Sequence, residues 1–397
     1  MATARRSLSY GLTANVVILG VVSLFTDVSS EMIIPILPFF LTYVLFASPV
    51  IVGLVEGSAD SVVSFMKIFS GQFSDAAGKR KRFVGAGYGL STAMKVLFPF
   101  AQNWPEFFAL RIIERTGKGV RDAPRDALLT ESTPPETRGK AFGFHRSMDT
   151  AGAIAGPIVT LVILGTIAAS LTIAEAYRLV LLLAAIPAVV SVLIVLFVRE
   201  PTRSPAPKQP LRMTFRGIPK PLRAFIGIAT LFSFADFSYV FMLLRAGLVY
   251  GTTEAILLYV LYNIVYAAHA FPAGIISDRF GRKPVVLIGY IAFVAMASLL
   301  AISSDLRILA LGFILYGLSY GMAEGTQRAL VADFAPPETK ATVLGAYHTS
   351  VGVVKLASGV VAGLLFAIQP AFTFAFGAVV AIVAVIALAR WRPPARL

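Results

Sequence analysis

The segment "GQFSDAAGKRK" (residues 71–81) returns in altered form as "GIISDRFGRKP" (residues 274–284). Both copies place a glycine, three residues, an aspartate, two residues, a glycine and then basic side chains. Glycine permits a tight turn and a close approach of two helices, and the aspartate can pair with a nearby arginine or with the positive N-terminal end of a helix. We therefore predict two copies of one helix-connecting loop, defined by Gly71, Asp75, Gly78 and Arg80, and by Gly274, Asp278, Gly281 and Arg282.

Two further matches extend the repeat to the whole chain. "TPPETRGKAFGFH" (133–145) matches "APPETKATVLGAY" (335–347) at an offset of 202, and "FTDVS" (25–29) matches "FADFS" (234–238) at an offset of 209. Between the copies lies a segment rich in proline and basic residues, 199–223. Self-similarity of this kind indicates two equivalent halves. We predict an N-terminal bundle at 1–198, a cytoplasmic linker at 199–221 and a C-terminal bundle at 222–397.

The composition indicates that both halves are embedded in a membrane. Of the 397 residues, 57% are hydrophobic and only 14% are charged, whereas a soluble domain carries about 25% charged residues. A helix needs about 20 apolar residues to cross a bilayer. We predict an all-α integral membrane protein with twelve spans, at 14–44, 49–73, 83–101, 106–128, 141–166, 174–198, 222–248, 254–277, 284–303, 306–332, 341–367 and 370–391.

The net charge of +14 reflects topology rather than a nucleic-acid partner. Basic residues gather in 78–82, 279–284 and 199–223, on one side of the predicted spans, while Arg178 and Arg307 fall near the other side. Cytoplasmic loops carry this excess of lysine and arginine. We therefore predict that both termini are cytoplasmic.

With these motifs the chain resembles the major facilitator superfamily over nearly its full length, and within it the twelve-helix exporters of the drug/proton antiporter type. The resemblance implies two pseudo-symmetric six-helix bundles that rock about a binding site near the bilayer midplane. It also implies that the repeated loops act as latches that hold one conformation and release in the other. A multi-pass protein of a bacterial or archaeal plasma membrane, functional as a monomer, is the expectation.

The stretch "GAIAGP" (152–157) supplies a second resemblance. It is similar to the GxxxGP core of a motif associated with proton-coupled exporters of this superfamily, but "IVTL" (158–161) stands where that motif continues to a glycine pair. The alternative is a GxxxG surface that packs one helix against another. Both roles remain open for Gly152, Gly156 and Pro157.

Acidic residues inside the predicted spans are candidates for coupling, because ionisable groups in a membrane are costly and point to function. Asp27 and Glu31 stand one turn apart and share a helix face. Asp236 is the repeat equivalent of Asp27, and Glu324 that of Asp122. Burial disfavours a charged carboxylate and a basic neighbour favours it, so either a protonation switch or a permanent salt bridge is possible. We predict proton coupling at Asp27, Glu31 and Asp236.

The stretch "RIIERTGKGVRDAPRDAL" (111–128) is rich in charge but aligns at an offset of 202 with the apolar "FILYGLSYGMAEGTQRAL" (313–330). We therefore predict that it is the fourth membrane helix, with its charged stripe facing an aqueous cavity. Candidates for the substrate cavity are Arg111, Glu114, Arg115, Lys118 and Glu324. Candidates for a cytoplasmic gate are Arg121, Asp122, Arg125, His145, Arg146 and Asp149, together with the eight residues of the two loops.

Catalytic and cofactor functions find no support in the sequence. The chain has three histidines and no cysteine, which gives a metal site little basis, and no nucleotide-binding or hydrolase motif is present. We predict no enzyme activity, no cofactor and no metal. The leading hypothesis is a secondary transporter that exports a small molecule in exchange for protons. Its rivals are an importer of a small organic anion or metal complex, and a transporter-like receptor or lipid flippase.

Overall fold

The computed structural model of the chain describes residues 12–200, 218–336 and 340–393, and all the regular elements in these ranges are helices. These residues pack into two compact units. The N-unit comprises residues 12–40 and 62–200, and the C-unit comprises residues 41–61, 218–336 and 340–393. The predicted linker lies mostly outside the described residues, and the predicted bundle boundaries remain predictions.

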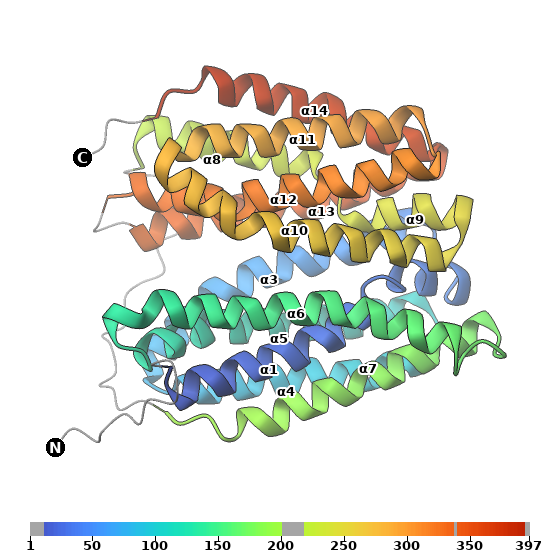
Figure 1. Cartoon of the computed structure of the whole chain (residues 1–397), viewed down its shortest axis with the longest axis horizontal. Coiled ribbons are helices and arrows are strands. Elements are labelled where there is room, and N and C mark those ends of the chain that lie inside the picture. Colours follow the sequence, from blue (N-terminus) through green and yellow to red (C-terminus); the bar gives the residue numbers. More distant parts are fainter. Residues whose placement is uncertain (1–11, 201–217, 337–339, 394–397) are drawn as a thin grey trace. The chain divides into compact units, whose positions relative to one another are not determined.

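The N-unit contains α1 (Ala14–Ile33), α2 (Leu37–Phe39), the later part of α3 (Pro49–Ala77), α4 (Arg80–Leu97), α5 (Trp104–Glu131), α6 (Arg138–Gly165) and α7 (Ile173–Val195). Its helices lie side by side (Figure 1). Local signals set their starts: the Asn103 side chain accepts a hydrogen bond of 3.0 Å from the N–H of Glu106, which satisfies a free donor at the start of α5. The apolar core of the N-unit includes Val16, Leu19, Val84, Tyr88 and Leu128.

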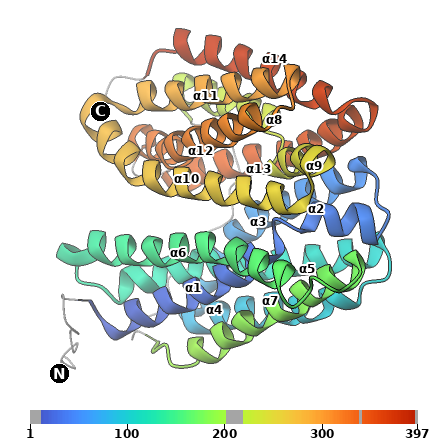
Figure 2. The same cartoon turned by 45° about the vertical axis from the view of Figure 1, so that its right-hand side comes forward.

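The C-unit contains α8 (Lys220–Ala235), α9 (Tyr239–Tyr250), α10 (Thr252–Phe280), α11 (Arg282–Ile302), α12 (Leu306–Phe334), α13 (Lys340–Ile368) and α14 (Pro370–Arg390), together with the first part of α3. Figure 2 shows the side-by-side packing of α10, α11 and α12. Aromatic rings fill its interior, among them Phe232 and Tyr290, which stack with centroids 3.6 Å apart. The backbones of α3 and α13 meet at Gly53 and Gly359. A side chain would not fit there, because a Cβ at Gly53 would lie 1.9 Å from the carbonyl oxygen of Gly359.

Helices occupy all twelve of the predicted positions, and ten of them are long and apolar enough to cross a membrane. α4 and α5 are the two that are too polar on this measure. α4 begins with the basic run 80–82, and α5 carries the charged stripe 111–128. The presence of a helical membrane domain is therefore confirmed, whereas the count of twelve spans and the side of the termini remain predictions.

Two predicted spans are interrupted where the sequence suggested single elements. The span predicted at 14–44 consists of α1, α2 and the π-turn Phe40–Val44, with Pro35 and Pro38 at the change of direction, because proline lacks the amide donor that a continuous helix requires. The span predicted at 222–248 is divided into α8 and α9 by three residues outside either helix, 236–238. No proline or glycine marks this second break.

Candidate functional site

The first loop is organised around the buried Arg80 guanidinium. It pairs with Asp75, donates a hydrogen bond of 2.6 Å to Ser74 Oγ, and lies 3.1 Å from Glu131 Oε1. Gly78 has a φ of 62°, in the left-handed region that favours glycine. The loop therefore ties the end of α3 to the start of α4 and to the end of α5.

The second loop has a similar arrangement, although Arg282 directly follows Gly281 whereas Arg80 stands two residues after Gly78. Arg282 Nη1 lies 2.5 Å from Asp278 Oδ1 and donates a hydrogen bond of 2.6 Å to Ser277 Oγ. Arg282 Nε lies 3.0 Å from Asp333 Oδ2, and Gly281 has a φ of 96°. The hydroxyl and the acid that complete each cluster were missed by the sequence reasoning, although the repeat offset of 202 to 203 relates them: Ser74 with Ser277, and Glu131 with Asp333.

The expectation of a close helix approach at the first glycine of each loop is not met. A Cβ on Gly71 would meet its nearest neighbour, Ala123 Cβ, at an ordinary 3.5 Å, and a Cβ on Gly274 would meet nothing within 4 Å. Only the second glycine of each loop, with its positive φ, has a conformation that requires glycine here.

The two acids of α1 lie where α1 crosses α6 most closely. A Cβ on Gly152 would lie 2.8 Å from Asp27 Cβ, and a Cβ on Gly156 would lie 2.6 Å from Glu31 Cβ. Small residues spaced by four allow helix backbones to approach in this way. The glycines of "GAIAGP", followed by Pro157 inside α6, therefore form a helix-packing surface, and the structure brings this surface together with both predicted coupling acids.

Charged groups from α5 and α6 surround Asp27, which also interacts with Glu31 of its own helix. It interacts electrostatically with Asp149, Lys118 and Arg121. Asp149 accepts a hydrogen bond from the Ser23 hydroxyl and lies 3.5 Å from Nδ1 of the buried His145. Arg146 Nη1 lies farther from the same carboxylate, at 4.0 Å, and its side chain is exposed. One connected polar cluster thus joins predicted coupling residues to predicted gate residues.

The N-terminal part of the charged stripe of α5 is buried inside the N-unit, where its charged side chains lie close to one another. The Glu114 carboxylate lies 3.2 Å from Arg111 Nη1 and 3.5 Å from Arg115 Nε. Lys95 of α4, which the sequence reasoning did not place at the site, is almost fully buried and donates to the hydroxyls of Ser29 and Ser30 at 3.0 Å and 2.8 Å. The sequence around Lys95 contains no motif that indicates this burial.

The C-terminal part of the stripe contacts other residues of α3 and α4. Arg121 donates a hydrogen bond of 3.1 Å to Ser91 Oγ and lies 4.3 Å above the Tyr88 ring, a distance suited to a cation–π contact. Asp122 lies 2.9 Å from Lys67 Nζ, and the Arg125 side chain pairs with Asp122 at 4.0 Å. These contacts tie α5 to α3 and α4.

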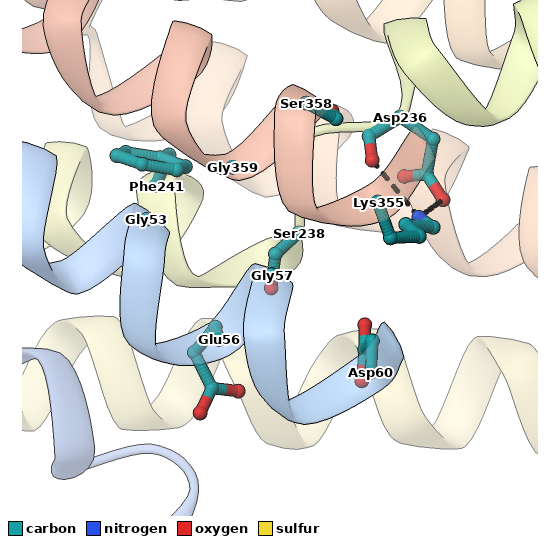
Figure 3. Close-up of a pocket in the computed structure, with 10 residues that line it drawn as sticks. All are labelled: Gly53, Glu56, Gly57, Asp60, Asp236, Ser238, Phe241, Lys355, Ser358 and Gly359. Atoms are coloured by element: carbon teal, nitrogen blue, oxygen red, sulfur yellow. Dashed lines mark hydrogen bonds and ion pairs between the residues drawn. The ribbon is translucent and has the colours of Figure 1, made fainter. Parts of the chain in front are cut away.

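In the C-unit the predicted acids belong to two clusters. Asp236, in the break between α8 and α9, binds Lys355 Nζ and accepts a hydrogen bond of 3.0 Å from Tyr316 Oη. Glu324 of α12 pairs with Arg328 and accepts a hydrogen bond of 3.2 Å from Tyr266 Oη. Figure 3 shows the small pocket beside Asp236, which Glu56 and Asp60 of α3 also line.

The described residues contain no group of three or more histidine, cysteine, aspartate or glutamate side chains arranged to hold a metal ion. The site is instead made of paired charges and hydroxyl groups. Such a site can bind a polar solute or exchange a proton.

Comparisons with known proteins agree with this architecture. The family model described as Major Facilitator Superfamily matches residues 19–251 and 225–397. An uncharacterised MFS-type transporter of Methanocaldococcus jannaschii is 38% identical to the chain over 379 residues, which cover 94% of this chain and 93% of that protein.

Solved structures match the fold at low sequence identity. A mutant of the nucleoside transporter NupG superimposes with a TM-score of 0.80 at 15% identity, covering 94% of this chain and 99% of that one. A D-xylose–proton symporter superimposes with a TM-score of 0.77 at 15% identity, covering 95% of this chain and 97% of that one. At such identities the likeness concerns the fold alone.

Proposed function

The chain belongs to the major facilitator superfamily, and from this premise we propose that it exports a small molecule in exchange for protons. Membership makes it a secondary transporter, a multi-pass protein of the cell membrane and not an enzyme. The proposal adds the direction of transport, the coupled ion and the residues. Alternating access of two six-helix bundles, joined by a cytoplasmic linker, is the proposed mechanism.

The position of Asp27 is the observation that carries the proposal. Its Cβ is held against Gly152 of α6, and Lys118, Arg121 and Asp149 act on its charge. A carboxylate with both cationic and anionic neighbours changes its proton affinity when any one of them moves. We assign Asp27 as the main proton carrier, with Glu31 and Asp236 as further coupling residues.

The two charged loops support a gating role. Each holds an arginine between an aspartate, a serine and an acid of the next helix, so that three helix ends are joined by one side chain. We propose that these clusters are the latches that release during transport. The cluster of His145, Arg146 and Asp149 would act with them at the same cytoplasmic gate.

The two polar helices fit the proposal as membrane spans. Charges on α5 are paired with groups on α1, α3 and α4 or within α5 itself, and paired charges facing a bundle interior are tolerated at membrane depth. We therefore propose that α4 and α5 complete twelve spans. Arg111, Glu114, Arg115 and Lys118 would line the substrate pathway in the N-unit, and Glu324 in the C-unit.

Proton flux in proteoliposomes tests the coupling. A resistance screen over drugs, siderophores and metabolites would first identify compounds that are less toxic to cells expressing the protein. These compounds would then be applied to vesicles that contain the protein and a pH-sensitive dye. Antiport predicts that an outward flow of solute through the cytoplasmic face drives protons the opposite way. Movement of solute and protons in the same direction would reject export and favour the importer, whose support is the basic excess of α5.

The role of Asp27 is tested by Asp27→Asn, which keeps the size of the side chain and removes its charge. The variant should express and fold as the wild type does but lose transport driven by the pH gradient. Glu136→Gln provides a control, since Glu136 is an exposed acid of the N-unit outside the site. Normal coupling in Asp27→Asn would remove Asp27 from the mechanism, whatever the direction of transport.

A further inference from the structure

The membrane span Lys220–Tyr250 is broken at its middle. α8 ends at Ala235 and α9 begins at Tyr239. Within the break, short turns replace the regular helix bonds: the N–H of Phe237 bonds to the carbonyl of Ala235 at 3.0 Å, and that of Ser238 to the carbonyl of Asp236 at 3.2 Å. Broken helices inside a membrane are tolerated only where other groups satisfy the freed backbone atoms.

The ammonium group of Lys355 satisfies this break from α13. Lys355 Nζ lies 2.5 Å from the carboxylate Oδ2 of Asp236 and donates a hydrogen bond of 2.9 Å to the backbone carbonyl of the same residue. Figure 3 shows both interactions converging on the tip of the lysine side chain. A neighbouring residue of α13, Ser358, donates a hydrogen bond of 2.9 Å to the carbonyl of Phe234, so α13 provides two donors to the end of α8.

The break presents two oxygen atoms to one point, the backbone carbonyl and the carboxylate of Asp236 at the end of α8. In discontinuous membrane helices, unwound backbone carbonyls and the C-terminal ends of half-helices coordinate small cations. The adjoining pocket is lined by Glu56 and Asp60 in addition to Asp236, with Lys355 as its only basic lining residue.

We propose that the break at 236–238 is a monovalent-cation site and that the Lys355 ammonium is its resident, covalently tethered occupant. A tethered cation cannot dissociate, so the wild-type protein keeps the break filled without sodium. A proton bound by Asp236 would release the lysine, which is compatible with a role for Asp236 in coupling. The proposal stands whether or not the chain exports its substrate.

The repeat shows that this device belongs to the C-unit alone. Asp236 matches Asp27, but Asp27 lies inside the continuous helix α1. At the offset of 202 that relates α13 to α6, Lys355 matches Ala153, next to Gly152. In the N-unit the glycine next to this position allows two backbones to meet, whereas in the C-unit a lysine pairs with the broken helix.

Thermal unfolding of the purified protein tests the assignment. Melting temperatures would be measured at equal ionic strength in the chlorides of sodium, methylammonium and choline, for the wild type, Lys355→Ala and the double variant Asp236→Asn with Lys355→Ala. We expect Lys355→Ala to melt several degrees lower in choline and to recover most of that loss in sodium or methylammonium. The wild type and the double variant should not distinguish the salts.

Arg328→Ala is the matched control, because Arg328 pairs with Glu324 on α12, where the helix is unbroken. It should show no selective response to sodium. A Lys355→Ala protein that responds equally to all three salts, or a wild type that responds to sodium as strongly as the variant, would overturn the proposal.

A second comparison decides the matter if Lys355→Ala does not fold. Removing one partner of a buried pair leaves an uncompensated charge, whereas removing both does not. The proposal therefore requires the double variant to yield more folded, monodisperse protein than Lys355→Ala alone. Equal loss in the single and double variants would show that Lys355 has a packing role that is independent of Asp236.

Discussion

The substitution Gly152→Ala tests whether the crossing of α1 and α6 sets the position of Asp27. The added methyl group would lie 2.8 Å from Asp27 Cβ, 2.8 Å from the carbonyl oxygen of Leu24 and 3.0 Å from the amide nitrogen of Val28. Two of these three atoms belong to the backbone, so no side-chain rotation relieves the contact. Since non-bonded carbon atoms prefer about 3.5–4.0 Å, α1 must move away from α6 by roughly 1 Å.

The expected loss of stability follows from this displacement. Overpacking of a close-packed interior costs about 1–3 kcal/mol of stability. For a domain of about 150–250 residues, such as the N-unit, a loss of 1 kcal/mol lowers the melting temperature by about 2–4 °C. Gly152→Ala should therefore melt roughly 2–12 °C below the wild type. The displacement also moves the Asp27 carboxylate relative to Lys118, so proton-coupled transport should fall further than the amount of folded protein.

Gly143→Ala is the control within the same helix. A Cβ at Gly143 meets nothing within 4 Å, and alanine is favoured over glycine in a helix by about 1 kcal/mol. This variant should be as stable as the wild type or more so. Melting temperatures in detergent, followed by proton-flux measurements, compare the two proteins. If Gly152→Ala matched Gly143→Ala in both assays, the backbone crossing would not set the position of Asp27.

Four further substitutions address the loops and the α3–α13 contact. Arg80→Ala should lower the melting temperature more than Arg282→Ala, because the Arg80 side chain is 5% exposed and the Arg282 side chain 22%; the reverse order would contradict this. Gly78→Ala should cost about 1–2 kcal/mol in chemical unfolding, since alanine is strained at positive φ; no loss would mean that the turn adapts. Gly53→Ala should prevent folding, because its methyl group would lie 1.9 Å from the Gly359 carbonyl oxygen; a monodisperse wild-type profile in size-exclusion chromatography would refute it.

Ten of the helices were predictable because their length and apolar composition suffice to indicate a membrane span, whereas the charged α5 was predicted only through its repeat partner, 313–330. The break at 236–238 was not, because its causes lie far along the chain. The segment 234–238 contains no proline or glycine, and the groups that stabilise it, Lys355 and Tyr316, come from α13 and α12. Local propensity gives no information about such tertiary partners. The first span differs, since Pro35 and Pro38 mark its change of direction in the sequence itself.

The loops show which parts of a site a repeat can reveal. The shared spacing of the two copies identified their aspartates, glycines and arginines, and an offset of 202 relates Glu131 to Asp333. These acids lie about 50 residues from the loop, which is why a motif confined to the loop missed them. Lys95 had no counterpart to compare, and its burial against Ser29 depends on how α4 packs on α1.

The close crossing of α1 and α6 separates the frame of the protein from its chemistry. Because two backbones place the Cβ of residue 27, a different ionisable group at that position would stand in the same place as the aspartate. Under the proposed function, Asp27→Glu would alter the proton affinity of the carrier. The pH range in which the transporter works is therefore open to adjustment by single substitutions, and that range could be matched to an acidic or an alkaline habitat.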